Sequence, residues 1–225
     1  MAISGPAGSG KSTLCGWIIE RLQRPLGKRT FETLTCHVEA DVPGEATSYA
    51  IAKRLVLQLL EKDIGNRQLF REIEKAYNIA ASTDASILKV AIWKCLDVGL
   101  EQFKRTGNVM IVVDGFDNIR SGDKAASEIV NHLSLLAVNH SSVQLITFSR
   151  VALVPSKGRN HKFDITPDHT HDDLRNVIDH ALEKYSHFRD QTEHAREAIV
   201  EKLLHVAHGN FLWGILTTAL LKRET

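Results

Sequence analysis

The chain has 225 residues, 43% of them hydrophobic and 24% charged, a composition that excludes a disordered, collagen-like or low-complexity chain. Because 28 Lys and Arg stand against 27 Asp and Glu, no net positive field would draw the chain onto nucleic acid or an acidic membrane surface, and we expect neither partner. No apolar run approaches the ~20 residues that span a bilayer, and no signal peptide is visible, so we expect a cytoplasmic protein.

The first third of the chain alternates strand and helix patterns. Residues 2–4 predict a short strand that runs into a glycine-rich turn, and apolar residues then keep helical spacing up to residue 22. A second strand is expected over 33–39 and a loop over 41–48. Apolar residues then recur on one face of a helix over 51–60.

The middle of the chain continues the alternation. A helical pattern begins at residue 84 and stops near Gly107, and a second one covers 125–138. Continuous apolar runs at 109–113 and 143–148 are typical of strands buried on both faces of a parallel sheet. With a weak strand at 162–165, this β-α-β order predicts an α/β fold with right-handed crossovers.

After Pro167 the pattern becomes helical only. We expect a capping box at Thr170–Asp173, followed by helices that end near Tyr185, at Gly209 and near Lys222. The sequence therefore predicts two domains, a nucleotide-binding domain over 1–167 and a small helical lid over 168–225.

The clearest chemical motif lies between the first strand and the first helix. Residues 5–12 match the pattern G-x-x-x-x-G-K-S, in which x is any residue. Glycines let successive backbone N–H groups curl around an anion, and the start of the helix adds its dipole. Polyphosphate is the natural ligand of such a loop. We expect the nucleotide to contact Gly5, Pro6, Ala7, Gly8, Ser9, Gly10, Lys11, Ser12 and Thr13.

Three side chains have distinct expected roles around the phosphates. Lys11 would reach the β- and γ-phosphates as a point charge, and the Ser12 hydroxyl would ligate Mg²⁺. Asp114 closes an apolar run, so its carboxylate would emerge at the carboxyl edge of the sheet and hold Mg²⁺ through a water. The expected metal ligands are therefore Ser12 and Asp114.

Two further residues follow strands at the same edge. Asp117 is a candidate general base or water-orienting group. Arg150 follows the run at 143–148, where a guanidinium can sense or stabilise a γ-phosphate, although a surface arginine is the alternative. The candidate catalytic residues are thus Asp117, Asp114 and Arg150.

Cysteine and histidine give no metal framework in the sequence. The three cysteines, at positions 15, 36 and 95, are spaced too widely for a zinc motif, and we expect buried structural thiols in a reducing compartment. The histidine pairs at 169/171 and 205/208 lack companion ligands, so we expect solvated or capping side chains there.

Four segments together resemble the NACHT domain of STAND-class NTPases, the signalling NTPases of NOD-like receptors. They are Ile3–Leu14, Ile111–Asp117, Ile146–Arg150 and Ala207–Trp213, the last of which is similar to the A-x-G-x-F-L-W segment of fungal NACHT proteins. The resemblance implies a three-layer P-loop NTPase sandwich with a parallel five-stranded sheet in the order 5-1-4-3-2, and a helical lid.

The resemblance also implies a function. A NACHT module binds ATP or ADP with Mg²⁺: ADP holds a closed monomer, and exchange for ATP opens it and drives self-association in signalling, innate immunity or incompatibility. Hydrolysis is expected to be weak or absent. We expect this chain to be one excised module or a fragment, without effector or sensor domains.

Three departures from the usual NACHT pattern bear on the chemistry. Asn118 stands where members carry an acid, so the hydrolytic carboxylate falls to Asp117 or is missing. The residues on either side of Ser149-Arg150 differ from the usual Thr-Ser-Arg-Pro. Phe211 stands where relatives often have an adenine-contacting proline, and it would either stack on the base or pack in the core. The sequence does not distinguish ATP from GTP.

Two other functions remain open. The glycine-rich motif also begins small-molecule and nucleoside kinases, and Lys157, Arg159 and Lys162 weakly imitate a phosphate-clamping kinase lid. The second alternative is a degenerate scaffold that acts through its helices without useful nucleotide binding.

Overall fold

A computed structural model describes residues 1–24, 31–39, 46–80, 85–103, 107–119, 122–153 and 161–221. Contacts divide the chain into two units. The first contains Met1–Ile3 and Ser12–Lys162, and the second contains Ser4–Lys11 and Phe163–Thr225. The second unit thus includes most of the glycine-rich loop as well as the expected lid, and the domain boundary at 167/168 stays a prediction.

The fold is α/β, as the sequence predicts. The sheet has five strands in the order β2-β3-β4-β1-β5. Read from β5, this is the order 5-1-4-3-2 that the family resemblance implies. The strands are β1 (Ala2–Ser4), β2 (Phe31–His37), β3 (Asn108–Asp114), β4 (Val143–Ser149) and β5 (Lys162–Asp164).

Two parallel pairings join the first three strands of this order. β2 pairs with β3 and β3 with β4, both in parallel. The apolar run of β3 is buried from Val109 to Val113, as expected for a strand covered on both faces. The register places His37 opposite Asp114, so β2 and β3 end side by side.

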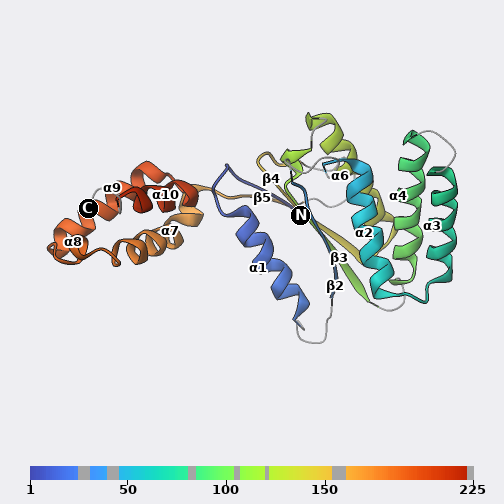
Figure 1. Ribbon diagram of the computed structural model, residues 1–225, viewed down its shortest axis with the longest axis horizontal. Coiled ribbons are helices and arrows are strands. Elements are labelled where there is room, and N and C mark those ends of the chain that lie inside the picture. The colour runs from blue at the N-terminus through green and yellow to red at the C-terminus, as the bar shows by residue number, and fades with distance from the viewer. Residues whose placement is uncertain are drawn as a thin grey trace. The chain divides into compact units, whose positions relative to one another are not determined.

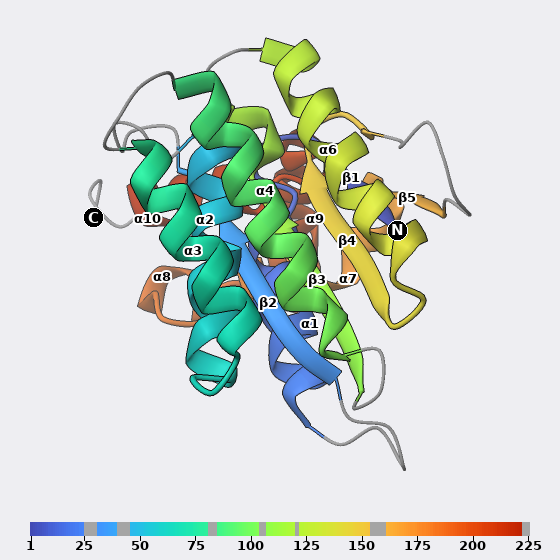
Figure 2. The same cartoon turned by 90° about the vertical axis from the view of Figure 1, so that its right-hand side faces the viewer.

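Helices cover both faces of the sheet in the first unit. Figures 1 and 2 show α1 (Lys11–Gln23) on one face and α2, α3, α4 and α6 on the other. The second group consists of α2 (Ser48–Lys62), α3 (Arg67–Ala80), α4 (Ala85–Glu101) and α6 (Gly122–Asn139). A short 3₁₀ helix, η1 (Phe116–Asn118), follows β3.

Sequence reasoning missed α3. The helix is amphipathic, but in its described part only Leu69 and Ala76 are buried hydrophobic residues, and most of its surface is polar. It packs mainly against α4. Tertiary packing of this narrow apolar stripe therefore stabilises the helix.

The second unit is a small helical body. It contains α7 (Pro167–Leu182), α8 (Ser186–Arg189), α9 (Glu193–Ala207) and α10 (Phe211–Leu221). Residues of α7, α8 and α9 share one core that includes Leu174, Ile178 and Leu204. Helix α9 ends at His208 and Gly209, which both have positive φ angles, so the predicted end near Gly209 is confirmed.

The predicted start of α7 is wrong. The helix begins at Pro167, with Thr166 as its N-cap and His169 completing the capping box. Thr170 lies inside the helix, where its hydroxyl donates to the Pro167 carbonyl. Proline is favoured in the first turn because its missing N–H has no helical partner there anyway. The expectation of a capping histidine is confirmed by His169.

Within the residues that the structure describes, no helix combines the length and apolar character needed to cross a membrane.

Candidate functional site

The glycine-rich loop has the backbone conformation of an anion cradle. Gly8 and Gly10 have φ angles of 78° and 82°, a region that residues with a Cβ rarely adopt. The Ser9 N–H donates to the Pro6 carbonyl at 3.3 Å and tightens the turn. Such alternation of backbone conformations turns successive N–H groups toward one point.

The start of α10 holds this loop within the second unit. The Phe211 N–H donates to the Gly8 carbonyl at 2.8 Å. Asn210 caps α10, because its side-chain oxygen accepts from the Trp213 N–H at 3.0 Å. A Cβ added to Gly8 would lie 2.0 Å from that same oxygen. The loop and the Gly-Asn-Phe-Leu-Trp segment are therefore in direct contact.

Lys11 lies over the glycine-rich loop. Lys11 Nζ donates to the carbonyls of Gly5 at 2.8 Å and Pro6 at 2.7 Å. Ser9 is 4% exposed, and in the described part of the chain its hydroxyl is buried without a hydrogen-bond partner. An ammonium at the rim and an unsatisfied buried hydroxyl both fit a phosphate ligand.

Phe211 lies against both the loop and the helical core. Its ring is 3.4 Å from where a Cβ on Gly10 would stand. It is half-buried and packs on the core of the second unit. The structure thus gives this residue a packing role beside the loop, and stacking on a base stays a prediction.

The first turn of α1 adjoins the end of β3 in the first unit. Ser12 and Thr13 are exposed, whereas Cys15 is buried. The Cys15 thiol lies beside Asp114, and burial together with this negative charge raises the pKa of Cys15 to about 12. Ser12 is one turn before Cys15, on the same face of the helix. The two expected metal ligands, Ser12 and Asp114, therefore lie on neighbouring elements.

The carboxyl ends of β2 and β3 bring His37 to Asp114. His37 Nδ1 is 3.6 Å from a carboxylate oxygen of Asp114. The Asp114 residue is 6% exposed, whereas half of the His37 side-chain surface is accessible. Asp114 is thus at the strand end that the sequence predicts, with a histidine partner that sequence reasoning missed. Only the parallel register, which pairs positions 37 and 114, could have indicated this contact.

Asp117 and Arg150 form an ion pair. Arg150 Nε is 2.9 Å from one carboxylate oxygen of Asp117, and the backbone N–H of Arg150 donates to the other at 3.1 Å. The Arg150 side chain is 61% exposed. The two candidate catalytic residues are therefore brought together, with the acid already engaged by the arginine.

Asn118 has a structural role where NACHT proteins usually carry an acid. Its amide donates to the Val38 carbonyl at 2.7 Å. Gly115, with φ 80°, lets this carbonyl approach, because a Cβ there would lie 2.6 Å from the Val38 oxygen. The amide ties the end of β2 to the turn after β3, and a carboxylate could not donate this bond.

We therefore expect Asn118→Asp to destabilise the chain more than Asn118→Ala. The aspartate places a carboxylate against a carbonyl that has lost its donor, a change that costs about 1–3 kcal/mol. Urea unfolding of both variants and the wild type would measure the difference. An Asn118→Asp variant as stable as the wild type would show that the amide bond to Val38 contributes nothing.

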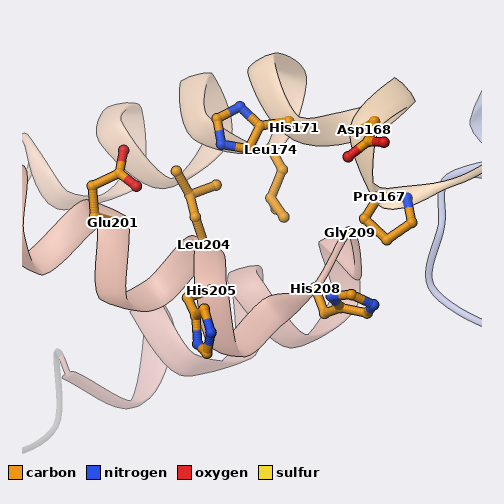
Figure 3. A pocket seen from close by; sticks show the side chains of 9 residues that line it. All are labelled: Pro167, Asp168, His171, Leu174, Glu201, Leu204, His205, His208 and Gly209. Atoms are coloured by element: carbon orange, nitrogen blue, oxygen red, sulfur yellow. The ribbon is translucent and has the colours of Figure 1, made fainter.

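The second unit also has a cavity between α7 and α9 (Figure 3). Its volume is about 260 Å³. Figure 3 shows Asp168 and His171 on the α7 side and Glu201 and His205 on the α9 side. The residues that line it are Pro167, Asp168, His171, Leu174, Glu201, Leu204, His205, His208 and Gly209. None of the sequence-predicted site residues is among them.

A comparison with known protein families matches two thirds of the chain. Residues 1–150 match the family described as Nephrocystin 3, N-terminal, which is 150 of the 225 residues. The matched region contains the glycine-rich loop, Asp114, Asp117 and Arg150. No curated protein matches the chain. The chain therefore belongs to the Nephrocystin 3 N-terminal family.

Proposed function

We propose that this chain is an ATP- and Mg²⁺-binding module of the NACHT type that acts as a cytoplasmic nucleotide-dependent switch. ADP holds it closed, and ATP opens it for self-association in a signalling protein. The observation that carries the proposal is the glycine loop, in which Gly8 and Gly10 have left-handed conformations and Lys11 opens helix α1. Triphosphate is the ligand that suits this loop.

The donor set fits a magnesium nucleotide. The Ser12 hydroxyl and the Asp114 carboxylate are hard oxygen donors of the kind that Mg²⁺ accepts. Bound Mg²⁺ would neutralise charge on the β- and γ-phosphates. The protein itself would supply the loop N–H groups and the Lys11 ammonium, which bind and orient the phosphates.

The contact between the glycine-rich loop and α10 would couple nucleotide binding to the position of the helices in the second unit. Gly8 and Asn210 are packed against each other, and the Gly8 carbonyl accepts from the Phe211 N–H. A nucleotide that reshapes the loop would therefore change the position of α10. A ligand shifts such an equilibrium only by its differential affinity for the two states, so ADP and ATP must differ in their loop contacts.

Weak or absent hydrolysis follows from the residues after β3. Asp117 is held by Arg150 through two contacts, and the Asn118 amide is committed to Val38. An amide cannot accept a proton from water at neutral pH, and both carboxylate oxygens of Asp117 already contact Arg150. Slow turnover suits a switch that hydrolysis resets.

Sedimentation velocity tests the switch. We expect a larger species with MgATP than with MgADP, because only the ATP state associates. The variant Arg150→Ala serves as a second arm, since loss of a γ-phosphate sensor should make the two nucleotide states alike. Monomers of identical sedimentation in both nucleotides would contradict the assembly part of the proposal.

An ADP-release assay separates the switch from a kinase. Acceptor-dependent turnover of about 1–100 per second would favour the kinase, and acceptor-independent trace release favours the switch. Of the residues suggested as a kinase lid, Lys157 and Arg159 lie outside the described residues, and Lys162 begins β5.

A further inference from the structure

Three different metal-binding side chains meet at the ends of β2 and β3. Cys15, His37 and Asp114 each offer one ligand atom, and these atoms all lie within 4.8 Å of one another. They come from α1 and from two adjacent strands, so the fold gathers residues that lie far apart in the sequence. All three belong to the first unit.

The donor types decide which ion suits the cluster. A sulfur, an imidazole nitrogen and one carboxylate oxygen form a mixed set that favours a thiophilic divalent cation such as Zn²⁺. Magnesium takes oxygen ligands and demands octahedral geometry, so it would not use the thiol. Three protein ligands and one open position are typical of zinc sites that keep a water or bind a substrate oxygen.

The surroundings also suit a bound ion. Cys15 and Asp114 are buried, at 1% and 6% exposure, whereas half of the His37 side-chain surface is accessible. A cation would therefore enter the site past His37, and the sides of the site formed by Cys15 and Asp114 are shielded from solvent. The strand register fixes His37 beside Asp114, so two of the three ligands are positioned by the sheet itself.

We propose that Cys15, His37 and Asp114 form a zinc-binding site with one open coordination position. On binding, the Cys15 sulfur bonds to Zn²⁺ as the thiolate and its proton leaves to solvent, while His37 binds through its neutral ring. The site does not depend on nucleotide. Zinc bound there would occupy the Asp114 carboxylate, and any competition with MgATP rests additionally on the proposed function.

Cobalt(II) titration of the nucleotide-free full chain tests the site. We expect one Co²⁺ per chain with a thiolate-to-cobalt charge-transfer band that Zn²⁺ abolishes. Cys15→Ser should remove the band. His37→Ala should weaken cobalt affinity by more than about 10-fold, since even residues that only support a ligand cost that much. The exposed position of His37 makes this variant the one that keeps the native fold.

Matched controls exist for both ligands. Cys95→Ser removes another buried thiol, and His187→Ala removes another exposed imidazole; neither should change the cobalt spectrum. Absence of a charge-transfer band in the wild type, or a band unchanged in both Cys15→Ser and His37→Ala, would overturn the zinc site. Neither outcome bears on ATP binding, so the proposed function stands or fails separately.

Discussion

Lys11→Ala should weaken ATP binding far more than it changes the stability of the ligand-free chain. Lys11 Nζ now donates to two loop carbonyls, and phosphate oxygens would replace them as stronger, charged acceptors. A hydrogen bond to a charged group contributes about 1.5–3 kcal/mol, so we expect ATP affinity to fall by about 10- to 100-fold.

Thermal unfolding with and without MgATP measures this effect. A ligand at 100 times its Kd stabilises the folded state by about 2.7 kcal/mol, and Lys11→Ala should lose about half of that gain or more. Lys53→Ala, an exposed lysine on α2, is the matched control and should keep it. An equal ATP-induced shift in wild type and Lys11→Ala would show that the loop lysine does not bind phosphate.

Gly8→Ala should damage both the loop and its contact with α10. The φ angle of 78° costs a residue with a Cβ roughly 1–2 kcal/mol. The added Cβ would also lie 2.0 Å from the Asn210 oxygen that caps α10, so Asn210 must give up the cap or the loop must shift. We expect weaker ATP binding by about 10-fold or more together with lower stability.

Gly16→Ala is the control for the glycine substitution. Gly16 lies in α1, and a Cβ there would meet nothing within 4 Å. In a helix interior, alanine is favoured over glycine by about 1 kcal/mol, so this variant should be as stable as the wild type or more. If calorimetry gave both alanine variants the same ATP affinity as wild type, the conformation of Gly8 would not matter for binding.

The strands and the loop could be predicted because their signals are local. An unbroken apolar run such as Val109–Val113 predicts a strand buried on both faces, and the spacing of glycines with Lys11 predicts the loop. The end of a parallel strand then fixes where Asp114 lies. Helical periodicity likewise predicts α6 close to its observed bounds, and Gly209 predicts the end of α9.

Contacts between distant positions could not be predicted in this way. His37 joins Asp114 only because β2 and β3 align in register, and Asn210 faces Gly8 only because α9 ends at two left-handed residues. The spacing of the three cysteines predicts no zinc motif, because a spacing rule detects only ligands that are near one another in the sequence. The cluster of Cys15, His37 and Asp114 forms only in the folded chain. The start of α7 was missed because Thr166-Pro167 competes with Thr170 as a helix start, and the proline wins.

Equilibrium dialysis of labelled ATP with the wild-type chain and Mg²⁺ tests the central claim most directly. The glycine loop, Lys11, Ser12 and Asp114 together predict one saturable site per chain from which ADP displaces the label. A chain that retains no ATP at millimolar nucleotide, while its unfolding transition shows that it is folded, would contradict nucleotide binding and with it the proposed switch.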